Sequence, residues 1–157
     1  MTRFFKKIIV LLMSITAMVS ISNVNALSSI NSYTYIEEQF QDGSYIEVAV
    51  EQSNVFARSS ITGKKTASYK GSSGTTYWSV TVTGTFTYNG KTASCTESSV
   101  STKNYSTSWK LSNAKSSKSG AIALASVTAK QYHQDGSILK TVNQTVKLTC
   151  SVSGKLF

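Results

Sequence analysis

Hydrophobic and polar residues alternate with a period of two along most of the chain after residue 26. In residues 76–88 the odd positions carry hydroxyls, and the even positions are apolar or small. These even positions are Trp78, Val80, Val82, Gly84, Phe86 and Tyr88. Such alternation is typical of a strand with one buried face. Asn89-Gly90 follows directly and favours a two-residue hairpin turn, because both central residues of that turn take positive φ.

The turn at Asn89-Gly90 also predicts the register of its hairpin. With a two-residue loop, Phe86 pairs with Ala93 and Gly84 pairs with Cys95. Directly opposite residues lie on the same face of a sheet. Cys95 is therefore expected on the apolar face, opposite a glycine that leaves room for its sulfur.

A second hairpin is predicted over residues 121–152, around Asp135-Gly136. Pairing His133 with Ile138 sets small alanines opposite larger residues, which fills a sheet face without overpacking. The resulting pairs are Ala129 with Val142, Ala125 with Val146, Ala123 with Leu148 and Ala121 with Cys150. Cys150 is thus also expected on the apolar face.

Cys95 and Cys150 are the two cysteines of the chain. In an exported protein such a pair is a candidate disulfide. The bond would enclose about 54 residues and stabilise the fold by about 4 kcal/mol, less any strain. Two buried free thiols are the alternative.

The remaining segments continue the β pattern. Residues 33–38 and 45–51 flank a Gln-Asp-Gly-Ser turn, and residues 105–111, with Trp109, predict a further strand. Residues 112–120 are interpreted as a polar loop. The predicted organisation is a signal peptide (1–26), an acidic β-hairpin (27–52), a linker (53–63) and a basic β-domain (64–157).

The chain is therefore predicted to be all-β, a small antiparallel β-sandwich or barrel with one disulfide. Cys95, Trp109 and Cys150 follow the order seen in immunoglobulin domains. However, seven residues after Cys150 are too few for another strand, and Leu148 occupies the place of the tyrosine corner. The predicted domain is immunoglobulin-like in size but not in topology.

The first 26 residues have the layout of a signal peptide. Arg3, Lys6 and Lys7 precede an apolar stretch over residues 8–19, and small residues end the segment at Ala26. The stretch is shorter than the about 20 residues that a spanning helix needs. We expect cleavage after Ala26 and secretion of the remainder, with an uncleaved anchor as the alternative.

Charge is divided unevenly along the chain. Residues 27–51 hold five acids and no base, whereas the chain from residue 52 onward holds 13 bases and two acids. The second part carries +11, so the predicted mature chain carries +6. The expected hairpin would place Glu38 opposite Glu47, with Glu51 on the same face, which is unfavourable without a nearby cation. This acidic cluster could form a weak calcium site or a partner surface. The interpretation we prefer is that the acidic hairpin lies against the basic domain of the same chain.

Lysine dominates the basic part of the chain. Six lysines are selected as candidates for binding an anionic polymer: Lys64, Lys65, Lys70, Lys91, Lys103 and Lys110. Dispersed lysines also protect strand edges and keep a secreted protein soluble. The more specific interpretation is that the lysines attract an anionic cell-wall polymer, such as teichoic acid, or an acidic glycan. Nucleic acid fits less well, because bidentate recognition relies on arginine and only Arg58 lies beyond the leader.

Residue sets typical of catalysis are missing from the sequence. His133 is the single histidine and flanks an Asp-Gly turn, and no G-x-S-x-G motif occurs. Histidine and cysteine are too few for a metal site built from them. The row Thr81, Thr83, Thr85 and Thr87 is similar to ice-binding and carbohydrate-binding arrays, but an ordinary solvated strand face explains it. We predict no enzymatic activity, no metal and no cofactor.

Several runs carry a resemblance to a known family. They are Trp78-Ser-Val-Thr-Val-Thr-Gly-Thr-Phe-Thr-Tyr-Asn-Gly90, Ala93-Ser-Cys95, Ser108-Trp-Lys110, Ser117-Lys-Ser-Gly120 and Val146-Lys-Leu-Thr-Cys150. Together they resemble an uncharacterised family of small secreted β-rich Firmicutes proteins. The resemblance covers about residues 64–157 and the acidic hairpin. It implies export, two paired cysteines and one β-module, and it transfers no activity and no functional residues.

These observations predict a secreted, non-enzymatic β-module that binds anionic cell-envelope or host polymers. The alternative is a secreted antagonist, a bacteriocin-like or protein-inhibiting factor that acts on a membrane or a protein. The sequence specifies neither the ligand nor the strand order nor the oligomeric state.

Overall fold

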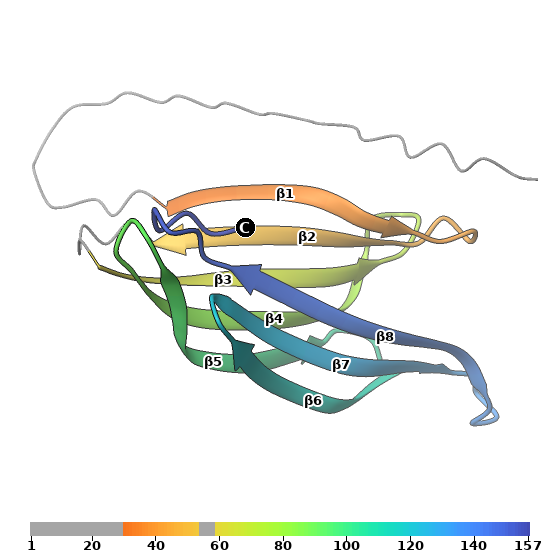
Figure 1. The fold of residues 1–157 in the computed structure, drawn as a ribbon. Coiled ribbons are helices and arrows are strands. Elements are labelled where there is room, and N and C mark those ends of the chain that lie inside the picture. Colours follow the sequence, from red (N-terminus) through yellow and green to blue (C-terminus); the bar gives the residue numbers. More distant parts are fainter. Residues whose placement is uncertain (1–29, 54–58) are drawn as a thin grey trace, which may run out of the picture.

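A computed structural model describes residues 30–53 and 59–157. This part of the chain consists of β-strands joined by turns (Figure 1). The strands are β1 (Ile30–Gln39), β2 (Tyr45–Ser53), β3 (Ser60–Lys70), β4 (Thr76–Tyr88), β5 (Ala93–Asn104), β6 (Trp109–Ser119), β7 (Ile122–Tyr132) and β8 (Ile138–Thr149). The predicted signal peptide lies outside the described residues. Within the two described ranges, no helix is long and apolar enough to cross a membrane.

The strands form two antiparallel sheets that face each other (Figure 1). One sheet has the order β1-β2-β3-β4-β5, and the other has the order β6-β7-β8. The described strands form no backbone ladder between the two sheets, so the sheets do not close into a barrel. The all-β prediction is confirmed. Of the two predicted architectures, a two-sheet sandwich and a closed barrel, the structure has the one with two sheets.

The period of two places apolar residues between the sheets. On β4 the predicted apolar face is buried at Trp78, Val80, Val82 and Phe86. On the facing sheet, small residues of β7 lie opposite larger residues of β8. These pairs are Ala123 with Leu148, Ala125 with Val146 and Ala129 with Val142, and they confirm the predicted register along the strands. The predicted pairing of His133 with Ile138 is wrong, because a register shift next to the turn pairs Ile138 with Tyr132.

An aromatic cluster holds β6 against β3 and β4. Trp109, the first residue of β6, is 2% exposed. Its ring centroid lies 4.9 Å from that of Tyr69 and 6.0 Å from that of Trp78. Tyr69 in turn stacks on Trp78 at 5.4 Å, and Phe40 lies 5.6 Å from Tyr69. Large rings bury more apolar area than other side chains, so this cluster is expected to contribute strongly to the packing of the two sheets.

The turn between β4 and β5 is two residues longer than predicted. Tyr88 pairs with Ala93, which leaves four residues in the turn. The side-chain carbonyl of Asn89 stabilises the longer turn by accepting hydrogen bonds from the backbone N–H groups two and three residues later, at 2.9 and 2.8 Å. Cys95 consequently lies opposite Phe86 rather than opposite a glycine.

Two segments predicted as loop or linker are strands. The predicted loop 112–120 lies largely in β6, which runs to Ser119, and residues 60–63 of the predicted linker begin β3. Residues 54–58 lie outside the described residues. The β6 segment lacks a hydrophobic period because nearly all of its side chains after Trp109 are solvent-exposed. A bulge between Ser112 and Lys115, where Asn113 has a φ of 55°, interrupts the pattern further.

The predicted disulfide is absent: both cysteines are buried free thiols. Their backbone amides bind different residues of the β6–β7 turn, Cys95 to the carbonyl of Gly120 (2.7 Å) and Cys150 to that of Ala121 (3.0 Å). The turn therefore lies between the two cysteines. Each thiol instead donates to a nearby carbonyl, at 3.1 Å for Cys95 and 3.4 Å for Cys150. Burial raises the pKa of both thiols, which makes them weak nucleophiles.

Candidate functional site

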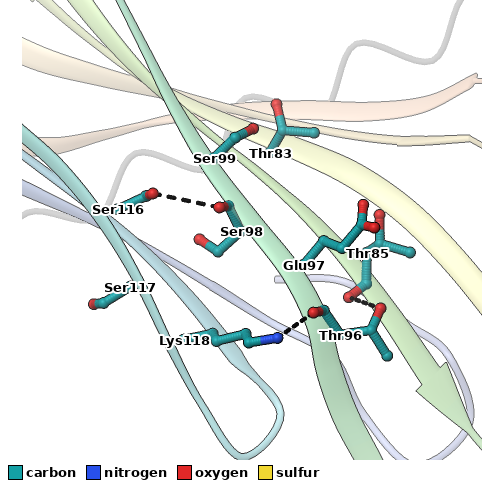
Figure 2. A pocket seen from close by; sticks show the side chains of 9 residues that line it. All are labelled: Thr83, Thr85, Thr96, Glu97, Ser98, Ser99, Ser116, Ser117 and Lys118. Carbon is teal, nitrogen blue, oxygen red and sulfur yellow. Dashed lines mark hydrogen bonds between the residues drawn. The ribbon is translucent and has the colours of Figure 1, made fainter.

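A polar groove runs along the seam between the two sheets, where β5 passes β6 (Figure 2). Its volume is about 560 Å³. The lining residues come from β4, β5 and β6: Thr83, Thr85, Thr96, Glu97, Ser98, Ser99, Ser116, Ser117 and Lys118. Seven of these nine side chains carry hydroxyl groups, so the groove offers hydrogen-bond donors and acceptors beside the apolar atoms that also line it.

Side chains bridge this seam in place of a backbone ladder. The hydroxyl of Ser116 donates to the carbonyl of Ser98 at 3.3 Å, and the ammonium of Lys118 donates to the carbonyl of Thr96 (Figure 2). These bonds satisfy backbone carbonyls at the edge of β5. The lining residues include one carboxylate, Glu97, and one ammonium group, that of Lys118.

Four lysines lie on the outer face of the three-stranded sheet. Trp109 and the β7 alanines point inward, so the alternate positions of β6, β7 and β8 point outward. The lysines at these outward positions are Lys110, Lys115, Lys130 and Lys147. We call this surface the lysine face. Ser117 also points outward on β6 and lines the groove, so the lysine face and the groove adjoin.

Like charges lie directly opposite each other on the lysine face. Lys110 is the register partner of Lys130. The ammonium of Lys110 lies 5.0 Å from the centroid of the Tyr132 ring, a cation–π distance. Within the described strands β6, β7 and β8 there is no Asp or Glu. Because opposed like charges destabilise a sheet, an anion bound over this pair would relieve the repulsion.

Three of the other candidate lysines have an acidic or aromatic neighbour within the molecule. Lys70 forms an ion pair with Glu47 at 2.6 Å, and Lys64 is the register partner of Glu51. Lys65 points into the core side of β3, is 9% exposed, and has its ammonium 5.7 Å from a tyrosine ring. These lysines are less free to attract an external polyanion than those of the lysine face.

The six predicted lysines therefore do not form one patch. Only Lys110 belongs to the lysine face. Lys64, Lys70 and Lys103 lie on the outer face of the five-stranded sheet, Lys65 lies inside, and Lys91 lies in the β4–β5 turn. The sequence prediction missed Lys115 because its segment was interpreted as loop. Lys130 and Lys147 could have been assigned outward from the correctly predicted β7–β8 register, since each neighbours an inward residue.

The predicted acidic cluster is also dispersed. A bulge between Ile36 and Glu38 shifts the register, so Glu38 pairs with Ile46 and Glu47 pairs with Ile36. Glu38 and Glu47 are therefore not opposed as predicted. Within the described residues no three His, Cys, Asp or Glu side chains gather at metal-binding distance, which leaves the calcium-site alternative without a geometric basis. The β1–β2 hairpin instead continues the sheet of the basic domain through the β2–β3 ladder.

An ionic network that the sequence did not reveal joins the β1–β2 turn to β8. The ammonium of Lys140 donates to Asp42 at 3.0 Å, to the hydroxyl of Ser44 at 3.2 Å and to the hydroxyl of Tyr69 at 2.8 Å. It also lies 4.2 Å from the ring centroid of Phe40. Hydrogen bonds from Ser44 and Lys140 lower the pKa of Asp42 from 3.8 to about 2. The network fixes the turn to the facing sheet.

Replacing Asp42 with asparagine is expected to reduce the dependence of stability on acid pH. The folded pKa of Asp42 is depressed, so its contribution is present above the unfolded pKa and is lost as pH falls from about 4 towards about 2. At neutral pH, Asp42→Asn should therefore unfold at a lower urea concentration than the unsubstituted protein. Between about pH 4 and about pH 2 its stability should fall less than that of the unsubstituted protein. Urea unfolding followed by circular dichroism at several pH values measures both effects.

Asp135→Asn is the matched control for Asp42→Asn. Asp135 stands in the same Gln-Asp-Gly-Ser sequence and accepts hydrogen bonds from Ser137, but within the described residues it forms no ion pair with a lysine. Its pKa is also lowered, chiefly by Ser137. The Asp42 variant should show the larger change. Equal changes would mean that the local turn, and not the tie to Lys140, accounts for the effect.

His133 occupies a structural position. It is exposed in the β7–β8 turn, where its backbone N–H donates to the carbonyl of Ser137 at 2.9 Å and its carbonyl accepts from Gly136 at 3.1 Å. The backbone hydrogen bonds of His133 therefore help to form the turn.

Comparison with known proteins gives no match. The chain matches no protein-family model, no curated protein and no solved structure.

Proposed function

We propose that this protein is a secreted, non-enzymatic module that binds anionic polymers of the cell envelope or of a host through its lysine face. The observation that carries the proposal is the pairing of Lys110 with Lys130 on a sheet whose strands contain no carboxylate. The layout of residues 1–26 supports export. So does the resemblance to secreted Firmicutes proteins.

The chemistry of the lysine face suits a flexible chain of repeated anions. Lysine ammonium groups act as point charges on flexible stems, so they attract phosphate or carboxylate groups without requiring one fixed geometry. The same face presents neutral hydrogen-bonding groups, such as Thr128, whose hydroxyl donates to the amide oxygen of Asn143 at 2.9 Å. Hydroxyl groups of the polymer have further partners in the adjoining groove. A polyol phosphate or an acidic glycan offers both kinds of group.

Co-sedimentation with Gram-positive cell walls tests the proposal. The chain from Leu27 onward, which contains every strand of the fold, is mixed with intact walls and with walls stripped of teichoic acid. Measurements at about 0.01 M and about 0.5 M salt span Debye lengths from about 30 Å to a few ångströms. Binding should require the polyanion and should fade at high salt. Equal and negligible binding to both wall types would overturn the cell-wall form of the proposal, and an acidic glycan on beads would then test the host form.

A further inference from the structure

The outer edge of β1 has no ladder partner in the described fold. The two sheet orders end at β1, β5, β6 and β8. Lys118 and Ser116 occupy carbonyls of β5 across its seam with β6. At β8 the chain folds back, and Thr149 and Phe157 exchange backbone hydrogen bonds of 2.9 and 3.1 Å. An unpaired strand edge attracts other strands because its N–H and C=O groups lack partners.

Residues on β1 make this edge suited to pairing. Tyr33, Tyr35 and Ile36 are 45%, 38% and 60% exposed. The rings of Tyr33 and Tyr35 lie side by side, with centroids 6.3 Å apart and planes at 20°. Residues 32–35 include no charged residue and no proline. The two features of β1 that usually block an edge, the carboxylates of Glu37 and Glu38 and the bulge between Ile36 and Glu38, lie near its end. The exposed rings and the uncharged stretch favour the addition of a strand along β1.

We propose that β1 pairs antiparallel with β1 of a second copy of this chain, about a two-fold axis at Thr34. A two-fold axis normal to the sheet places Thr34 opposite its own counterpart. Tyr33 of each copy then lies opposite Tyr35 of the other, on the face that these rings share with Val48 and Val50. Cross-strand aromatic pairs of this kind stabilise antiparallel sheets.

Charge selects this antiparallel pairing over a parallel one. Glu37 and Glu38 lie near the end of β1. In a parallel pairing in register, the carboxylates of the two copies would be directly opposed, which is destabilising. Antiparallel pairing about Thr34 separates each Glu37 from its counterpart by about 20 Å along the sheet, since six residues rise about 3.4 Å each.

The proposed dimer would present both lysine faces on the same side, a consequence that rests on the proposed function. The two-fold axis is normal to the sheet, so the inner faces of the two five-stranded sheets point the same way. Each three-stranded sheet covers the inner face of its own copy (Figure 1). Both outer lysine faces would therefore meet one polymer surface. Linking two binding faces raises overall affinity without any new contact.

Cysteine crosslinking tests the register directly. Thr34→Cys places two thiols opposite each other at the two-fold axis, within the span that a disulfide needs. Ser32→Cys is the control on the same strand and face, because its two copies would lie about 14 Å apart. Both positions are exposed. Under mild oxidation, Thr34→Cys should form a covalent dimer, whereas Ser32→Cys and the unsubstituted protein, with its buried thiols, should not.

Sedimentation of the unsubstituted protein provides the second measurement. An interface of one strand edge is small, so the mass is expected to double between about 1 µM and about 1 mM, the range of weak association. Thr34→Lys places two like charges at the axis and should remain monomeric. Equal crosslinking of Thr34→Cys and Ser32→Cys, or a monomer throughout the range, would overturn the dimer. Neither result would bear on wall binding by single copies, which the co-sedimentation experiment measures separately.

Discussion

Replacing Trp109 with alanine is expected to lower the free energy of unfolding by about 3–5 kcal/mol, the usual cost of removing a buried tryptophan side chain. Trp109 is 2% exposed and contacts the rings of Tyr69 and Trp78, at centroid distances of 4.9 and 6.0 Å. It is the buried anchor at the start of β6, a strand whose later side chains are mostly exposed. A loss of this size is a large share of the about 5–15 kcal/mol that stabilises a typical domain.

Trp109→Phe is the matched variant for this prediction. The indole Nε1 of Trp109 is buried and has no hydrogen-bond partner among the described residues. Phenylalanine keeps a ring in the cluster and removes this unpaired donor, whose burial is itself unfavourable. It should therefore cost clearly less than alanine. Urea unfolding followed by far-ultraviolet circular dichroism gives both values, and a cost below about 1 kcal/mol for alanine would show that the cluster contributes little to stability.

The sequence predicted the strands that have one buried face. On β4, β7 and β8 most inward positions are apolar or small, with the buried Gln144 of β8 as an exception, so period and burial largely agree. The register along β7 and β8 agrees with the one predicted from the Asp-Gly turn. β6 could not be found in this way, because its exposed serines and lysines have no hydrophobic period. Its strand conformation comes from the ladder to β7, a tertiary contact.

The disulfide prediction failed at the turn. It assumed a two-residue loop at Asn89-Gly90, but the Asn89 side chain stabilises a longer turn by accepting two backbone hydrogen bonds. The prediction that both cysteines point inward is confirmed by their burial. Facing the core does not by itself bring two sulfurs to bonding distance, and the two backbones bind different residues of the β6–β7 turn. Their separation depended on strand order, which the sequence did not specify.

The lysine excess predicts an anion-binding surface but not its place on the fold. Anion binding itself stays a prediction. Selecting the lysines of that surface required knowing which ones the molecule already pairs. Lys70 is engaged by Glu47 and Lys140 by Asp42, and both contacts join segments far apart in the chain. Only the fold separates these lysines from those of the lysine face.

Removing the charges of the lysine face is expected to weaken wall binding by close to a thousandfold at low salt. The variant carries glutamine at all four positions: Lys110, Lys115, Lys130 and Lys147. Each lysine near an anionic surface contributes about 1 kcal/mol, so four contribute about 4 kcal/mol. Folding should be preserved, because three of these side chains are exposed and loss of the Lys110–Lys130 repulsion is mildly favourable. Binding isotherms on intact walls measure the change, and urea unfolding checks the fold.

A second four-lysine variant separates the face from the overall charge. It carries glutamine at Lys64, Lys91, Lys103 and Lys155, which are all exposed and all lie off the lysine face. Both variants lower the charge of the chain from Leu27 onward from +6 to +2. Long-range attraction should fall equally in both, so the difference between them isolates contact at the lysine face. Equal losses would mean that binding follows net charge alone. If the control variant binds walls almost normally and the lysine-face variant binds them much more weakly, the polymer contacts the outer surface of the three-stranded sheet.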